Sequence, residues 1–170
     1  TELVQNGWIG GAGGPMGPDP RELAESDLII VWGGNPVSTQ VNVMAHISRA
    51  RKERGAKLVV IDAYQSPTAE VADDVLLVQP GTDGAVACAI MHVLFRDGFA
   101  DEPYMEKYTD NWRELKEHLQ DKTPVWAEKI SGVSCQKIEA LAREIGKTER
   151  TYIRIGYGFA RSRNGASQVH

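Results

Sequence analysis

Residues 26–36 read SDLIIVWGGNP, and this stretch decides the fold. Its apolar part, Leu28 to Trp32, is a continuous run of five residues that includes β-branched side chains. Such a run is typical of a strand buried on both faces of a parallel sheet. The turn sequence GGNP ends the strand, and a helix is predicted over residues 40–54. The stretch therefore predicts a strand, a tight turn and a helix in succession.

The same alternation continues along the rest of the chain. Further strands are predicted at 57–62, 75–79 and 151–155. A short helix is predicted after Asp19, and longer helices are predicted to end near Arg96 and Gly146. Short helical pieces are predicted at 101–108, 112–119 and 125–129. Short apolar strands that alternate with helices favour a parallel sheet. The predicted fold class is α/β: a three-layer Rossmann-like parallel sheet with helices on both faces.

The two ends of the chain indicate a piece of something longer. The chain starts at Thr1 without an initiator methionine and stops at His170, just after a stretch that reads as the beginning of another element. Residues 1–18 contain six glycines and two prolines, so we expect a loop there. Residues 19–160 are expected to form the Rossmann-like domain, and 161–170 to return into a neighbouring domain of a larger subunit.

Composition excludes several classes of function. The 170 residues carry 19 basic and 23 acidic side chains, a balance that disfavours general nucleic-acid binding. No apolar run approaches the ~20 residues of a membrane helix, so membrane insertion is not expected. Two cysteines, Cys88 and Cys135, are too few for a disulfide scaffold, a four-cysteine zinc site or a complete iron–sulfur site.

Candidate ligand-binding residues follow the predicted strands, because an open parallel sheet binds ligands beyond the carboxyl ends of its strands. Glycine allows close approach of backbone to ligand, and a carboxylate at such an end can accept hydrogen bonds from ribose hydroxyls. Together these features predict a nucleotide site. Its candidates are Gly33, Gly34, Asn35, Pro36, Asp62, Pro80, Gly81, Asp83 and Gly158.

Each of these elements also has a purely structural interpretation. The GGNP sequence can be only a tight turn, Asp62 only a turn carboxylate, and Asp83 only a first-turn residue favoured by the helix dipole. The usual dinucleotide pattern G-x-G-x-x-G is absent, which disfavours an ordinary NAD enzyme. The four histidines are scattered. No catalytic residue and no metal ligand is therefore predicted in this chain.

Several segments resemble those of one known family, the molybdopterin oxidoreductases of the dimethyl sulfoxide reductase type. Residues 26–36 resemble that family's W-G-x-N-P segment, GAKLVVID at 55–62 its G-A-K-apolar-D-P-R segment, and DDVLLVQPGTD at 73–83 its P-G-T-D segment. Residues 123–133 and 156–165 match later stretches. Order and spacing agree over roughly residues 19–165.

The resemblance implies a domain that binds the guanosine diphosphate part of a molybdopterin guanine dinucleotide. Carried over, Gly33, Gly34 and Asn35 would line the pyrophosphate, with Pro36 in the same turn. Asp62 would take the ribose hydroxyls. Gly81 and Asp83, after Pro80, would lie at the guanine, and Gly158 and Arg161 nearer the pterin. Two positions depart from the family pattern: D-P-R is Asp62-Ala63-Tyr64 here, and the usual glutamine is Arg161.

The resemblance also implies what the intact protein does. It would be the catalytic subunit of a molybdenum reductase or dehydrogenase, working in a prokaryotic cytoplasm or periplasm. The iron–sulfur cysteines and the molybdenum ligand would lie outside this chain, which alone should be inactive. Its partners would be the remaining domains of the subunit, and electron-transfer subunits are a further candidate. Two other classes stay open: a standalone NAD- or FAD-type enzyme, and a non-catalytic nucleotide-binding module.

Overall fold

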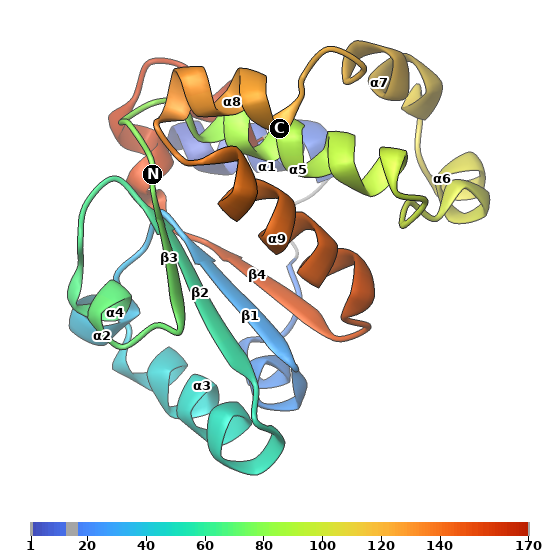
Figure 1. Ribbon diagram of the computed structural model, residues 1–170. Coiled ribbons are helices and arrows are strands. Elements are labelled where there is room, and N and C mark those ends of the chain that lie inside the picture. Colours follow the sequence, from blue (N-terminus) through green and yellow to red (C-terminus); the bar gives the residue numbers. More distant parts are fainter. Residues whose placement is uncertain (1, 13–16, 170) are drawn as a thin grey trace. The chain divides into compact units, whose positions relative to one another are not determined.

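The computed structural model describes residues 2–12 and 17–169 (Figure 1). The chain divides into two compact units. The first holds the chain up to Gly84 and from Thr148 onward, and the second comprises Ala85–Lys147. Residues 85–147 of the domain predicted over residues 19–160 thus form a compact unit of their own.

The first unit is built on a four-stranded sheet in the order β3-β2-β1-β4. The strands are β1 (Leu28–Trp32), β2 (Lys57–Asp62), β3 (Asp74–Leu77) and β4 (Thr151–Ile155), and all pairs are parallel. Trp32 is in register with Ile61 on one side and Ile155 on the other, so three strands end at one edge. The parallel α/β fold class predicted from the sequence is confirmed.

One face of the sheet carries the apolar core of this unit. The 3-10 helix η1 (Pro20–Glu25) and helix α3 (Val41–Arg54) pack together over this face. The buried core comprises Leu23, Ile29, Val31, Val43, Ile47, Ala50, Ala56, Leu58, Val60, Ala69 and Tyr152. Gly55 ends α3 in the left-handed region at φ 70°, where its N–H bonds to the carbonyl groups of Ala50 and Arg51.

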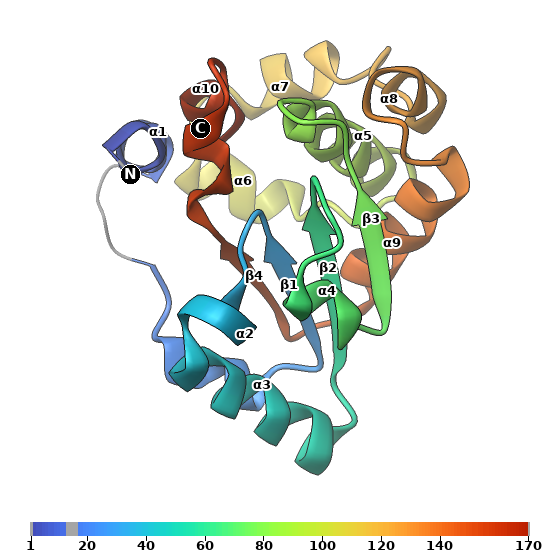
Figure 2. The same cartoon turned by 90° about the vertical axis from the view of Figure 1, so that its left-hand side faces the viewer.

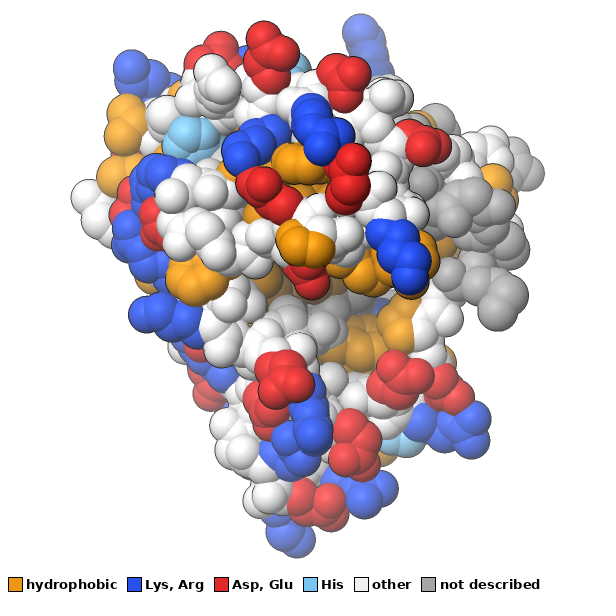
Figure 3. Space-filling model, turned by 90° about the vertical axis from the view of Figure 1, so that its right-hand side faces the viewer, with side chains coloured by type: hydrophobic (Ala, Val, Ile, Leu, Met, Phe, Trp, Pro, Cys, Tyr) orange, Lys and Arg blue, Asp and Glu red, His pale blue; other side chains and the backbone are white. Residues whose placement is uncertain are grey.

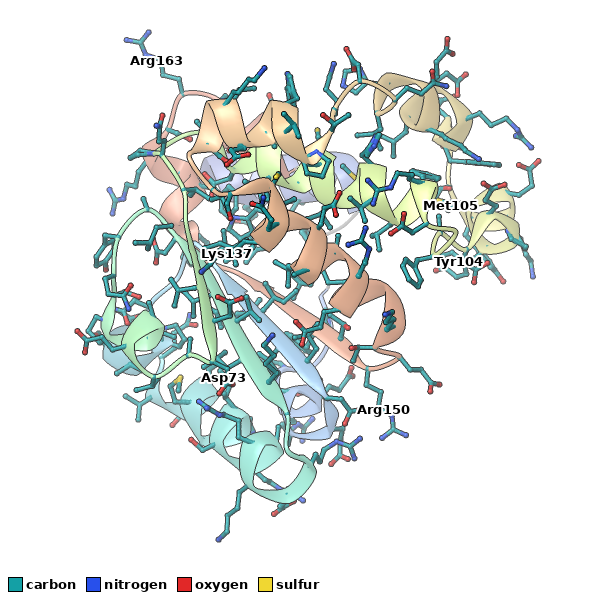
Figure 4. All side chains as sticks on the ribbon, viewed as in Figure 1. Asp73, Tyr104, Met105, Lys137, Arg150 and Arg163 are labelled. Atoms are coloured by element: carbon teal, nitrogen blue, oxygen red, sulfur yellow. The ribbon has the colours of Figure 1, made fainter. Side chains whose placement is uncertain are left out.

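Local bonds fix where these elements begin. Asp19 accepts a hydrogen bond from the backbone N–H of Arg21 at 2.9 Å, the cap that the sequence predicted for η1. Asp73, labelled in Figure 4, lies just before β3 and accepts from the backbone N–H of Leu58 at 2.7 Å. Its other carboxylate oxygen accepts from Arg51 at 2.7 Å, so this acid ties α3, β2 and β3 together.

Smaller helices lie in the same unit. They are α1 (Glu2–Ala12), α2 (Pro36–Thr39), α4 (Pro67–Glu70), η2 (Tyr157–Arg161) and α10 (Gly165–Val169). In Figure 2 the strand arrows point toward the end where η2 and α10 lie. The loop predicted for residues 1–18 is wrong for residues 2–12, and residues 1 and 13–16 lie outside the described part. Helix α1 packs on α10 at Gly7, where a Cβ atom would lie 2.4 Å from the Ala166 carbonyl oxygen.

The second unit is helical: α5 (Asp83–Arg96, whose first residues belong to the first unit), α6 (Glu102–Tyr108), α7 (Trp112–His118), α8 (Pro124–Ser131) and α9 (Cys135–Lys147). Arg96 and Arg143 both bond to Asp97, at 2.8 and 2.9 Å. Figure 3 shows basic and acidic side chains interspersed over the face that it draws. Among the described residues, no helix is both long and apolar enough to cross a membrane.

Candidate functional site

A cavity of about 510 Å³ lies at the carboxyl ends of β1, β2 and β4. Its lining residues are Gly33, Gly34, Asn35, Thr39, Gln40, Asp62, Tyr64, Arg154, Ile155, Gly156, Tyr157, Gly158 and Arg161. Six of the ten residues predicted for the site belong to this lining: Gly33, Gly34, Asn35, Asp62, Gly158 and Arg161. Pro36, Pro80, Gly81 and Asp83 are not among the lining residues.

Glycines let the turns after β1 and β4 approach each other closely. Gly33 has φ 64°, and its carbonyl oxygen accepts from the N–H of Gly158 at 2.9 Å. A Cβ atom on Gly156 would lie 2.2 Å from that oxygen, and one on Gly158 would lie 2.7 Å from it. Side chains are therefore excluded from this junction, and the cavity wall here is bare backbone.

Asn35 anchors the turn after β1. Its Oδ1 atom accepts from the buried Thr68 hydroxyl at 2.7 Å, and its Nδ2 atom donates to the Ser38 hydroxyl at 3.1 Å. Pro36 is buried at the start of α2. The Asn35 side chain thus has a structural role at the cavity wall. Pro36, buried at the first position of α2, holds the turn outside the lining.

Asp62 ends β2 and is only 8% exposed. Its Oδ1 atom accepts from the N–H of Ala63 at 2.7 Å. Burial raises the pKa of Asp62, the bond from Ala63 lowers it, and the negative charge of Asp83 raises it again. This residue is a largely buried hydrogen-bond acceptor at the edge of the cavity, within electrostatic reach of Asp83.

The residues predicted after β3 form a neighbouring segment outside the lining. Asp83 begins α5, and its Oδ1 atom accepts from the indole N–H of Trp32 at 2.8 Å. The Trp32 ring lies against Phe159, with 6.2 Å between ring centroids. Gly81 has φ 81°, and Pro80 is exposed. Trp32, at the end of β1, therefore links the cavity's strand ends to the segment that carries Asp83.

Arg154, which was not among the predicted site residues, lies on β4 and lines the cavity. Its Nη2 atom donates to Gln40 Oε1 at 2.8 Å, whereas its Nε atom is buried without a hydrogen-bond partner in the described part of the chain. An unsatisfied buried donor is costly and marks a place where a ligand can accept. The signal available was a single basic residue within the otherwise apolar strand TYIRI.

Two guanidinium groups and one carboxylate line the cavity, so its charge favours an anion. Arg161 lies at the end of η2. Arg163, two residues later, is exposed, and Figure 4 shows its side chain extending outward, away from the ribbon. Within residues 2–12 and 17–169, no group of three or more His, Cys, Asp or Glu side chains could hold a metal ion. The arrangement suits a phosphorylated ligand with hydroxyl donors.

The sequence matches the family model described as molybdopterin oxidoreductase over residues 10–169. It is 41% identical over 153 residues to "Probable oxidoreductase YoaE" of Bacillus subtilis (strain 168), covering 90% of this chain. It is 34% identical to "Probable dimethyl sulfoxide reductase chain YnfF" of Escherichia coli (strain K12), covering 88%. It is also 34% identical to "F420-dependent formate dehydrogenase 1 subunit alpha" of Methanococcus maripaludis, covering 92%.

These three relatives are much longer than this chain, which spans 22%, 21% and 23% of their respective lengths. Among solved structures, "Acetylene Hydratase from Pelobacter acetylenicus" superposes with a TM-score of 0.73 at 19% identity. The match covers 98% of this chain and 24% of that one. At this identity the superposition supports the fold alone.

Proposed function

The chain belongs to the molybdopterin oxidoreductase family, and from this premise we propose that its parallel-sheet unit holds the guanosine diphosphate part of a molybdopterin guanine dinucleotide. The observation that carries the proposal is the cavity of about 510 Å³ at the strand ends. Its wall is bare backbone at Gly33 and Gly156, two arginines supply positive charge, and Asp62 supplies an acceptor.

The residues present fit a diphosphate. Glycine at positions 33, 156 and 158 lets the two turns pack against each other and leaves backbone at this part of the cavity wall, where a phosphate can lie close to it. Arg154 offers a buried Nε–H that has no acceptor of its own, and a phosphate oxygen would satisfy it. Arg161 adds a second guanidinium at the exposed side of the cavity. These groups would bind and orient the phosphates.

The acceptors fit a guanosine. Asp62 can accept from the ribose hydroxyls, as a carboxylate at the end of the second strand of such a sheet does. Asp83 can accept from the N1–H and exocyclic amine of guanine, whereas adenine presents an acceptor where guanine has its N1–H. The bond from Trp32 uses one acceptor site of Oδ1, and the described residues offer Oδ2 no partner, so acceptor sites on both oxygens remain for the base.

For the whole protein we propose the catalytic subunit of a molybdenum oxidoreductase. The bound molybdenum–pterin group would supply two-electron redox chemistry, and this chain would hold its nucleotide end. We expect an iron–sulfur cluster in an amino-terminal part of the subunit. Partners would be the remaining domains of the subunit and electron-transfer subunits. Relatives named as dimethyl sulfoxide reductase and formate dehydrogenase support this class of activity.

Calorimetric titration of the 170-residue chain with GDP, GMP and ADP tests the proposal. GDP should bind more tightly than GMP, because the second phosphate adds charge-assisted bonds worth about 1.5–3 kcal/mol each. GDP should also bind more tightly than ADP. Equal affinity for GDP and GMP would contradict a binding site for the second phosphate. Equal affinity for GDP and ADP would contradict the assignment of Asp83 to guanine.

A further inference from the structure

Residues 80–84, which comprise the end of the loop after β3 and the first two residues of α5, are bonded to the side chain of Gln168 on α10. Gln168 Nε2 donates to the Gly81 carbonyl oxygen at 3.0 Å, and Gln168 Oε1 accepts from the Gly84 N–H at 3.1 Å. Asn164 Nδ2 also donates to the Gly81 carbonyl, at 3.1 Å. One primary amide thus bridges both sides of Asp83. We infer that Gln168 is a positioning residue that sets base selectivity by fixing Asp83, an inference that rests on the proposed function.

The two bonds of this bridge use both functions of an amide. Gly84 lies in the first turn of α5, where backbone N–H groups lack partners within the helix. Gly81, at φ 81°, turns its carbonyl group toward α10. Only a side chain that both donates and accepts can serve these two groups at once, as an amide does and a carboxylate or an apolar chain does not.

Asp83 is therefore fixed from two directions. Gln168 holds the backbone on both sides of it, and the Trp32 indole holds its Oδ1 atom at 2.8 Å. Two adjacent donors on a base demand a defined carboxylate direction, since hydrogen bonds weaken steeply away from linearity. If the backbone at Asp83 were free to shift, the carboxylate would lose this direction while keeping its charge.

Close packing fixes the place of α10 itself. A Cβ atom on Gly165 would lie 1.8 Å from the Phe159 carbonyl oxygen, so α10 follows η2 without room for a side chain at that turn. On the other side, Gly7 of α1 meets the backbone at Ala166. Gln168 thus projects from a helix whose backbone is packed against η2 and α1, which makes it a suitable anchor for residues 80–84.

The test compares three variants of the 170-residue chain. Gln168→Leu removes both bonds at similar volume, and Gln168→Glu keeps the acceptor for Gly84 but removes the donor to Gly81. Ser167→Ala, an exposed position on the same helix, is the matched control. Each protein is titrated with GDP, ADP and inorganic pyrophosphate, and its melting curve is recorded.

In the wild type we expect GDP to be preferred over ADP by about tenfold to a hundredfold. Gln168→Leu should reduce this ratio at least fivefold, on the order of one lost hydrogen bond. Gln168→Glu should reduce it less, and Ser167→Ala should leave it unchanged. Pyrophosphate affinity should stay within about twofold in all variants, because the phosphate-binding groups lie elsewhere. A general loss of structure would lower pyrophosphate affinity as well.

The outcomes separate the two claims. If the wild type prefers GDP and both Gln168 variants keep that preference, the positioning role is overturned and the proposed function stands. If the wild type binds GDP and ADP equally, the guanine assignment fails and the inference fails with it. If Gln168→Leu does not fold, the Gln168→Glu ratio decides, and an unchanged ratio there overturns the inference.

Discussion

Replacing Arg154 with methionine should weaken GDP binding without destabilising the free chain. The change removes a guanidinium whose Nε atom is buried without a partner and whose Nη2 atom bonds to Gln40 at 2.8 Å. A charge-assisted bond to phosphate contributes about 1.5–3 kcal/mol, so GDP affinity should fall by roughly tenfold to a hundredfold. In the free chain, loss of the Gln40 bond costs about 1 kcal/mol, and relief of the unsatisfied donor offsets a similar amount.

The assay is calorimetric titration with GDP alongside urea unfolding of each protein. Arg163→Met is the matched control, because Arg163 is exposed and extends away from the ribbon (Figure 4). The Arg163→Met variant should bind GDP within about twofold of wild type, and its free energy of unfolding should change by no more than about 0.5 kcal/mol. Unchanged GDP affinity in Arg154→Met would refute the reasoning. So would an equal loss of affinity in the Arg163 control, because the effect would then be one of net charge.

Three further predictions concern stability and the turns. Gly156→Ala places a methyl group 2.2 Å from the Gly33 carbonyl oxygen, so urea unfolding should show a loss of about 1–3 kcal/mol or more, and an unchanged midpoint would contradict the close approach. Asp62→Ala should weaken GDP binding by about tenfold or more in calorimetric titration. Because burial raises the pKa of Asp62, the protonated carboxyl group contributes stability below its unfolded pKa, and this contribution is lost as the pH rises through the folded pKa. The stability of the variant relative to wild type should therefore rise with pH. Hydrogen bonds from Arg96 and then Arg143 lower the pKa of Asp97 from the usual 3.8 to about 2. The wild-type chain should therefore lose stability as the pH falls from 3.8 to about 2, and Asp97→Asn should lose less over the same range.

The strands were predictable because each is a local pattern. The runs that form β1, β2 and β4 have the bounds that the sequence predicted. β1 and β2 are buried on both faces, so each shows as a continuous apolar run. Helix α1 was not predictable. Its glycines signal a loop in isolation, and the benefit of Gly7 appears only when the backbone of Ala166 lies against it.

Some residues of the candidate site could likewise be predicted from the sequence, and others could not. Residues that directly follow strands, such as Gly33 and Asp62, were predictable because topology alone brings strand ends together. Arg154 was not, since the register of β4 decides that it lines the cavity. Gln168 was not either, because its bonds to Gly81 and Gly84 join segments more than 80 residues apart.

The most direct test of the central claim locates the ligand on the chain. In an NMR titration of ¹⁵N-labelled chain with GDP, the backbone amide signals of Gly33, Gly34, Gly156 and Gly158 should shift together and saturate with one dissociation constant. Amides of α6 and α7 should stay in place and serve as the internal reference. Shifts centred on another surface, or no shift at the glycine junction at millimolar GDP, would contradict the claim that this cavity holds a guanosine diphosphate.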